Sequence, residues 1–129
     1  MKDNSKEIGK LGEKIAEDYL QKKGYKILDK NYVFKIPKSP KFGEIDIVTK
    51  KGDTICFFEV KTLLNPKTLI FPEEKVDFQK QKKLIKTAES WLIKNKIPLN
   101  KKWQIDIISI LLENGKAKIS HFENAIPYF

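Results

Sequence analysis

Two runs of strand-forming residues around a short turn signal constrain the fold of this chain more than any other feature. GEIDIV ends at Val48 and TICFFEVK ends at Lys61, with the turn former KKGD between them. Val, Ile and Phe favour strands, whereas Gly-Asp favours a tight turn. The segment from Ile45 to Lys61 is therefore predicted to form a β-hairpin at the centre of the chain.

The sequence on either side predicts two helices and three further strands. Apolar residues at helical spacing, with capping residues at the ends, predict helices over residues 5–23 and 77–95. Strand formers predict strands over residues 25–34, 103–112 and 117–122, the last two joined by a hairpin turn at Asn114-Gly115. Loops are expected through Pro37 and Pro40, and again through Pro66 and Pro72.

Each expected helix carries one apolar stripe that predicts its buried face. In the first helix the stripe consists of Ile8, Leu11, Ile15, Tyr19 and Leu20. In the second helix it consists of Leu84, Ile85, Ala88, Trp91 and Leu92. Helices with such stripes cover the faces of a sheet.

The order α-β-β-β-α-β-β predicts an α/β fold with a mixed central sheet of about five strands covered by helices. At 129 residues, 40% of them apolar, the chain fits a single domain over residues 1–129. No apolar run approaches the roughly 20 residues that cross a bilayer, and the first ten residues contain no apolar signal core. We therefore expect no membrane association.

One cysteine and one histidine restrict the available chemistry. Cys56 has no partner for an intramolecular disulfide, so the cytoplasm is the expected compartment. A structural zinc site usually takes four Cys or His ligands, and a Ser-His-Asp or Cys-His hydrolase would have to use His121 as its base. Polar chemistry is thus expected to rest on Asp, Glu, Lys and Gln.

The net charge of +9 has two interpretations. The basic excess favours a polyanionic partner because a lysine-rich face releases counterions from a phosphate backbone, and all 26 cationic side chains are lysines. Equally, a lysine-rich composition can reflect an A/T-rich genome, with the lysines scattered over a solvated surface. Without arginine, a nucleic-acid partner would be recognised through its backbone and shape rather than its base sequence.

The spacing within the hairpin brings acidic side chains together. A two-residue turn at Gly52-Asp53 would place Asp46 directly opposite Glu59, whereas a four-residue loop would place Glu59 opposite Glu44. In both registers Asp46, Glu59 and Lys61 share one face of the hairpin, and Ile45 shares the opposite face with Ile47. An odd-length loop or a bulge would separate them.

Two adjacent carboxylates with a nearby lysine suggest a metal-dependent phosphodiesterase. Oxygen-only ligands suit Mg²⁺ or Mn²⁺, and Lys61 can stabilise charge on a phosphate. The simpler alternative is a solvated charged strand, because Glu-x-Lys is a weak signal in a lysine-rich chain and recurs at residues 73–75. Against that alternative, Asp46 and Glu59 interrupt strongly apolar runs, where a charge is costly.

Two helical residues could complete this site. Glu13 lies at the edge of the first apolar stripe beside Gly9 and Gly12, which cost about 1 kcal/mol each in a helix and suggest close approach to the sheet. Gln81 occupies an otherwise apolar position of the second stripe, where it could contact a phosphate or a water. An ordinary surface glutamate and a residue at the edge of the core are the alternatives.

Three other residues have structural explanations. Asp106, within WQIDIISILL, is expected to be a buried, hydrogen-bonded acid or to support the site indirectly. His121, near the end of the last strand, is expected to be structural. Cys56 shares a strand face with Phe58 and Val60, which indicates a small core residue.

The chain resembles the YraN family of bacterial proteins. The resemblance is carried by GKLGEKIAEDYLQKKGYKILDKNY, FGEIDIV, FFEVKT, the Lys/Gln-rich helix and WQIDIISI, from about Ile8 to Phe129. That family is similar to restriction-endonuclease-like PD-(D/E)xK nucleases, especially archaeal Holliday-junction resolvases. The resemblance implies a three-layer α/β/α fold.

The same resemblance implies roles for five residues. Glu13 matches the acid of the first helix, Asp46 the first metal-binding acid, and Glu59 and Lys61 the E-x-K pair. Gln81 matches a polar residue of the following helix. Ile45 stands where the family of nucleases has proline.

Taken together, these features predict a nuclease that uses Mg²⁺ or Mn²⁺ and acts on structured DNA. Asp46 and Glu59 are expected to hold the metal, with Glu13 as an outer ligand. The alternatives are a nucleic-acid-binding protein that keeps the fold without cutting, and an adaptor that binds other proteins. A homodimer is suggested by analogy with junction resolvases alone.

Overall fold

The computed structural model describes residues 4–64 and 77–127 of the chain. The expected loop through Pro66 and Pro72 and the second Glu-x-Lys tripeptide lie outside the described residues.

The described residues form two helices and one five-stranded sheet. In chain order the elements are α1 (Ser5–Lys22), β1 (Lys26–Ile36), β2 (Ser39–Lys51), β3 (Thr54–Leu63), α3 (Phe78–Lys94), β4 (Trp103–Glu113) and β5 (Lys116–Phe122). The sheet order is β1-β2-β3-β4-β5, in which β3 and β4 are parallel and all other neighbours are antiparallel. The predicted α/β class, mixed sheet and element order are confirmed.

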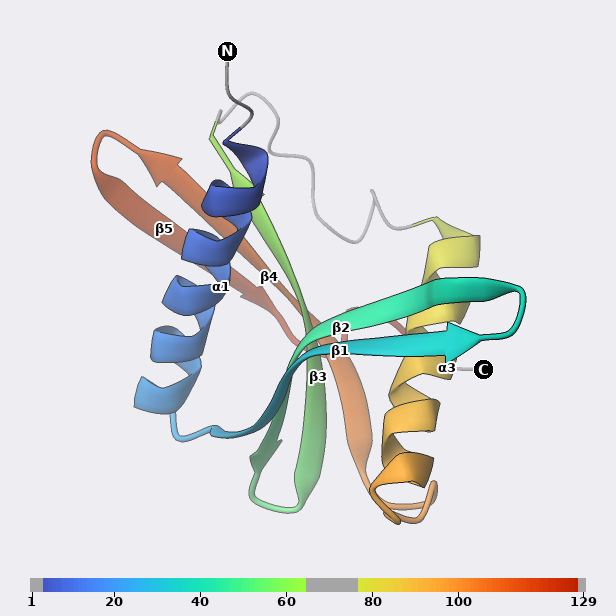
Figure 1. Cartoon of the computed structure of the whole chain (residues 1–129). Helices are drawn as coiled ribbons and strands as arrows, with labels where there is room; N and C mark the ends of the chain where they lie inside the picture. Colours follow the sequence, from blue (N-terminus) through green and yellow to red (C-terminus); the bar gives the residue numbers. More distant parts are fainter. Residues whose placement is uncertain (1–3, 65–76, 128–129) are drawn as a thin grey trace.

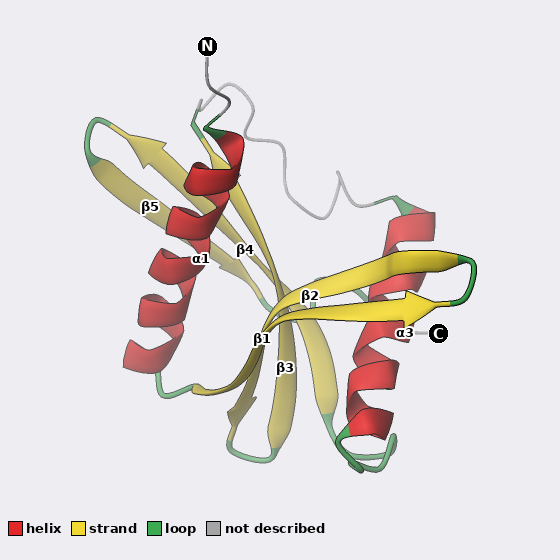
Figure 2. Ribbon diagram, viewed as in Figure 1, coloured by secondary structure: helices red, strands yellow, loops and turns green. Residues whose placement is uncertain are grey.

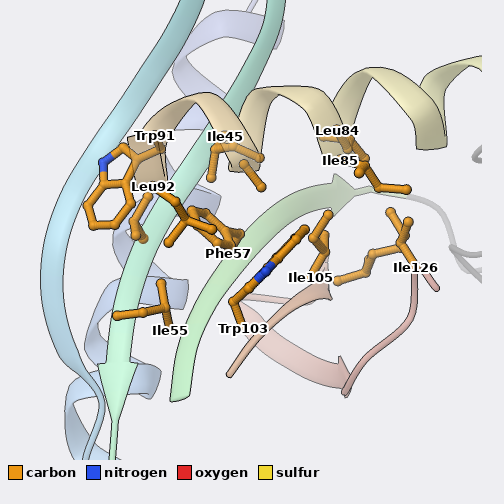
Figure 3. Close-up of a cluster of buried hydrophobic side chains, with 13 residues drawn as sticks. Ile45, Ile55, Phe57, Leu84, Ile85, Trp91, Leu92, Trp103, Ile105 and Ile126 are labelled. Atoms are coloured by element: carbon orange, nitrogen blue, oxygen red, sulfur yellow. The ribbon is translucent and has the colours of Figure 1, made fainter. Parts of the chain in front are cut away.

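The two helices lie on opposite faces of the sheet (Figure 1; Figure 2). Phe57 packs in the core cluster beneath α3, which also contains Trp91, whereas its neighbour Phe58 packs in the cluster beneath α1, which contains Ala16. Figure 3 shows the α3 cluster, where side chains from the sheet meet the helix. The sheet is therefore buried on both faces, as the three-layer expectation requires.

Strand β2 bends sharply at Asp46. It pairs with β3 only from Ile47 to Lys51, but remains paired with β1 beyond that point, so the β1–β2 hairpin swings away from β3 toward α3 (Figure 1). Asn31 of β1, near the same point, has a left-handed φ of 51°. The bend separates β2 from β3 just where the predicted acidic residues begin.

Because of this bend, the expectation that Ile45 and Ile47 share one face is wrong. Ile45 packs in the α3 cluster, and Ile47 packs in the α1 cluster with Phe58. Strict alternation holds only in a regular strand. On β3 the expected faces are confirmed, with Phe57 toward α3 and Cys56 toward α1.

The expected loop through Pro37 and Pro40 is mostly strand. Only a tight turn at residues 37–38 interrupts β1 and β2, and Pro40 lies inside β2. The register of β1 with β2 shifts here: Phe34 pairs with Gly43, whereas Ile36 pairs with Ser39. Pro40 falls in this irregular stretch, where the sheet does not require a hydrogen bond from its nitrogen.

Helix α1 packs through part of the predicted stripe and through two small residues: Leu20 is fully buried, and Ile15 and Tyr19 pack against the core cluster. Its buried residues are Gly12, Ala16 and Leu20, whereas Leu11 is 50% exposed, so the assignment of Leu11 to the buried face is wrong. A Cβ atom at Gly12 would clash with Thr62 of β3. The predicted close approach of helix and sheet is thus confirmed at Gly12.

Gly9, by contrast, meets nothing within 4 Å of where its Cβ would lie. The close approach predicted for both glycines therefore holds at one of them. A similar approach occurs at Gly43 of β2, where a Cβ would clash with the Thr87 side chain of α3. Each helix thus lies close to the sheet where a glycine provides the space.

The remaining local predictions agree with the structure. The α3 stripe is buried as expected, and the Asp77 carboxylate caps the helix by accepting a 2.8 Å hydrogen bond from the Lys80 amide. Asn114 and Gly115 have φ values of 51° and 72°, which a type I′ hairpin turn requires. Among the described residues, no helix has an apolar stretch long enough to cross a bilayer.

We expect Gly12→Ala to lower the free energy of unfolding by about 1 to 3 kcal/mol, because the added methyl pushes α1 away from Thr62. Gly9→Ala is the matched control on the same helix and should raise stability by up to about 1 kcal/mol, since alanine favours the helix and the space is open. Urea denaturation followed by circular dichroism measures both. Equal effects of the two substitutions would contradict the packing at Gly12.

Candidate functional site

The hairpin register selects one of the two predicted alternatives. Lys51 pairs with Thr54, and the same register continues to Ile47 and Phe58, so the turn is the two-residue Gly52-Asp53 turn. The next pair in this register would be Asp46 and Glu59. The strands separate there, which leaves both carboxylates at the point of divergence.

Asp46 closes the gap that the separated strands leave. In a continued ladder Val60 would lie opposite Ile45, but its amide instead donates a 2.7 Å hydrogen bond to Asp46 Oδ2. Backbone amides in a buried sheet need an acceptor, and the carboxylate supplies it. The side chain of Asp46 is thereby held in a defined orientation.

Glu59 is paired with two lysines. Its side chain is largely buried, and Oε1 lies 3.3 Å from Lys61 Nζ and 3.4 Å from Lys80 Nζ. Lys80 belongs to the first turn of α3. It lies three residues after the capping Asp77, and the packing of α3 against the sheet brings its ammonium group to Glu59 of β3. The sequence alone does not show that these two residues meet.

The buried acids interact unfavourably. Burial, then the charge of Glu59, raises the pKa of Asp46 from 3.8 to about 7; Glu13 and Glu44 add to this, while the Val60 hydrogen bond opposes it. For Lys80, burial is the largest single influence and lowers the pKa, but the charge of Glu59, the hydrogen bonds with Lys61 and Glu59 and the charge of Asp46 together outweigh it, so the pKa is raised. The site is therefore short of positive charge around Asp46.

A cavity of about 430 Å³ opens beside the acids on the α3 side of the sheet. Its walls include Asp46, Glu59, Glu44, Gln79, Lys80 and Lys83. Gln81, the predicted polar residue of this helix, is partly buried but is not among the residues that line the cavity, whereas Gln79 is. A role for Gln81 remains a prediction.

Glu13 approaches Asp46 from the other side. The two residues line a smaller cavity of about 250 Å³ next to α1, and Glu13 Oε1 accepts a 2.8 Å hydrogen bond from Asn31 Nδ2. Within residues 4–64 and 77–127, Glu13, Asp46 and Glu59 do not bring three ligand oxygens within 4.8 Å of one another. Of the neighbouring acids, Glu59 has the largest effect on the pKa of Asp46 and Glu13 has a smaller one, so the acidic pair is Asp46 with Glu59.

This donor set fits a hard divalent cation. Carboxylate oxygens are the only protein ligands that the pair offers, and the adjoining cavity has room for waters and a phosphate group. A dication would also relieve the repulsion that raises the pKa of Asp46. The residues present are therefore compatible with Mg²⁺ or Mn²⁺.

Three other candidates, Cys56, Asp106 and His121, are buried or partly buried away from the acidic pair. Cys56 is buried and its pKa is raised to about 12, chiefly by burial, so it is a core thiol rather than a nucleophile. Asp106 is fully buried and hydrogen-bonded, and His121 is bonded to it. Neither Asp106 nor His121 lines the cavities beside Asp46.

Comparison with known proteins finds similar chains over nearly the whole length. The model of a family described as "Uncharacterised protein family UPF0102" matches residues 12–110. A UPF0102 protein of Dictyoglomus thermophilum is 45% identical over 98% of this chain and 99% of its own length. One of Clostridioides difficile is 46% identical over 95% and 98%, and one of Thermodesulfovibrio yellowstonii is 46% identical over 92% and 95%.

Without metal, the stability of the protein should fall as the pH rises from about 4 to about 7. Over that interval Asp46 ionises in the unfolded chain, with its ordinary pKa of 3.8, but stays protonated in the folded chain, where the pKa is about 7. Asp46→Asn removes this penalty and keeps an acceptor for Val60. In EDTA the variant should therefore be more stable than the wild type at about pH 8, by roughly 2 to 4 kcal/mol.

Urea unfolding at the two ends of this pH range measures the effect, and the difference between the variants should shrink toward about pH 4. Asp53→Asn, in the exposed turn of the same hairpin, is the control: it keeps Asp46, so its stability should follow that of the wild type at both ends of the range. A stability difference for Asp46→Asn that is the same at both ends would mean that the carboxylate is not strained by its neighbours.

Proposed function

Because this chain belongs to the uncharacterised protein family UPF0102, the YraN family whose motifs it carries, we propose from its geometry that it is a metal-dependent nuclease acting on structured DNA. The main support is the pair of acids Asp46, which is partly buried, and Glu59, which is buried; they lie where β2 and β3 separate and adjoin a cavity bordered by lysines. Such an arrangement is costly for folding alone.

In this proposal Asp46 and Glu59 hold Mg²⁺ or Mn²⁺, and Glu13 contributes from the α1 side as an outer ligand. Such an ion would supply Lewis-acid chemistry at this position, namely polarisation of a phosphate oxygen and activation of water. Asp46 is suited to this role because the Val60 amide already fixes one of its oxygens. Its other oxygen has no hydrogen bond among the described contacts.

The lysines supply positive charge that the reaction needs. Lys61 and Lys80 both contact Glu59 Oε1, which keeps their ammonium groups beside the acids instead of extended into solvent. Hydrolysis of a phosphodiester adds negative charge to the phosphate oxygens, and fixed cations next to that position stabilise it. Lys61 is the expected catalytic lysine, and Lys80 is an addition from the structure.

The proposed substrate follows from the charge of the chain. The net charge is +9 and every cationic side chain is a lysine. This composition favours recognition of a phosphate backbone over recognition of a particular base sequence. DNA with an unusual shape, such as a junction or a flap, meets this requirement better than a specific site in a duplex. The proposed compartment is the cytoplasm, which suits the free thiol of Cys56; a homodimer is part of the proposal by analogy only.

Purified protein with Mn²⁺ or Mg²⁺ should cleave junction or flap DNA, and EDTA should stop the reaction. Asp46→Ala should reduce cleavage by about 100-fold or more because a metal ligand is lost, with DNA affinity unchanged or higher. Asp53→Ala, on the exposed turn of the same hairpin, should cleave like the wild type. Gel assays of cleavage and binding across a salt series measure these effects.

Failure to cut junction, flap, duplex and single-stranded substrates would overturn the nuclease proposal. Binding would then be the favoured activity if affinity still falls steeply with salt. If affinity is insensitive to salt, nucleic acid is not the partner.

Lys80→Gln should slow cleavage by about tenfold, since Lys80 lies beside Glu59 at the cavity wall. Lys82→Gln is its control: Lys82 is two residues away on the same helix, but its Nζ lies over the Phe78 ring. Single-turnover rates at saturating protein separate this effect from weaker DNA binding. Equal losses in both variants would assign Lys80 a role in general electrostatic attraction only.

A further inference from the structure

A second group of potential ligands lies away from the acidic pair. Asp106 of β4, His121 of β5 and Glu123 just after β5 each offer one ligand atom, and these atoms all lie within 4.8 Å of one another. A cavity of about 270 Å³ adjoins them and is lined by His121, Glu123 and Tyr19 among others. It shares no lining residue with either cavity beside Asp46.

Asp106 is held rigidly in this group. The residue is fully buried, and its Oδ1 accepts hydrogen bonds from Gln104 Nε2 at 2.8 Å and from the Asn124 amide at 2.9 Å. Its Oδ2 is left to His121 Nε2, also at 2.8 Å. One carboxylate oxygen thus fixes the orientation, and the other faces the imidazole.

His121 is oriented from its other nitrogen. The Tyr19 hydroxyl of α1 lies 3.2 Å from Nδ1, and the imidazole packs against Phe58. Histidine ligands of metal ions almost always have their second ring nitrogen engaged in such a bond. With an ion on Nε2, the ring proton resides on Nδ1 and donates to the Tyr19 oxygen.

The spacing and charge also suit a bound ion. Neighbouring ligands on a tetrahedral ion with bonds of about 2.0 Å are about 3.3 Å apart, so His121 Nε2 and Asp106 Oδ2, now 2.8 Å apart as hydrogen-bond partners, would separate by about half an ångström to hold the ion. Two carboxylates with a neutral imidazole neutralise a dication. The nearby ammonium groups, Lys23 and Lys51, lie over the rings of Tyr19 and Tyr25 and would face a neutral centre.

We propose that Asp106, His121 and Glu123 form a second metal site, for a divalent transition metal of the zinc class. One imidazole and two carboxylates favour Zn²⁺ over Mg²⁺, which distinguishes this site from the all-oxygen pair. Three protein ligands leave a coordination position toward the cavity. The ion would connect the end of β5 to β4, and through Tyr19 to α1.

The test uses the full-length, tag-free chain carrying Asp46→Asn, so that binding at the acidic pair does not interfere. Titration calorimetry with ZnCl₂ should give one ion per chain with a dissociation constant of about 10 µM or lower, and Zn²⁺ should raise the melting temperature. His121→Gln should abolish this binding. Glu123→Gln, at an exposed position, should weaken it at least about tenfold with no loss of folding.

Two further measurements exclude a purely structural role for this group. Tyr19→Phe should weaken Zn²⁺ binding by about tenfold, and Glu113→Gln, an exposed acid at the other end of the β4–β5 hairpin, should leave it unchanged. Because His121 is the single histidine, the ¹⁵N shifts of one imidazole report directly whether Zn²⁺ binds Nε2. No binding at about 100 µM Zn²⁺, or binding that is unchanged in Glu123→Gln and His121→Gln, would overturn the proposal.

Discussion

The hydrogen bond from the Val60 amide to the Asp46 carboxylate is the contact on which the arrangement of this protein depends. It lies where β2 leaves β3, and it gives an acceptor to an amide that would otherwise lose one inside a buried sheet. Because a carboxylate performs this task, the divergence of the strands brings a negative charge into the interior. Fold and candidate site therefore have the same origin.

The two helices confine that charge from both sides. Helix α1 approaches the sheet closely at Gly12, and α3 does so at Gly43. Asp46 accordingly borders one cavity on each side of the sheet, with Glu59, Lys61 and Lys80 on the α3 side and Glu13 on the α1 side. The lysines neutralise Glu59, but Asp46 keeps an uncompensated charge that a dication would balance.

The two proposed metal sites differ in chemistry as well as in place. The first offers only carboxylate oxygens beside a wide cavity, which suits an ion that exchanges waters for phosphate oxygens. The second includes an imidazole and two ligands that are already oriented by hydrogen bonds, which suits an ion held mainly by the protein. The single histidine of the chain belongs to the second site, so histidine chemistry would not reach the first.

Local patterns in the sequence determined the element order, the turns at Gly52 and Asn114, the buried stripe of α3 and the common face of Cys56 and Phe58, because turn chemistry and strand alternation depend on neighbouring residues. They left two hairpin registers open, and they misplaced Ile45 and Leu11. Nor did they connect Lys80 with Glu59 or separate Gln79 from Gln81. Those positions were decided by the bend of β2 and by how closely each helix approaches the sheet, and both result from packing between segments distant in the chain.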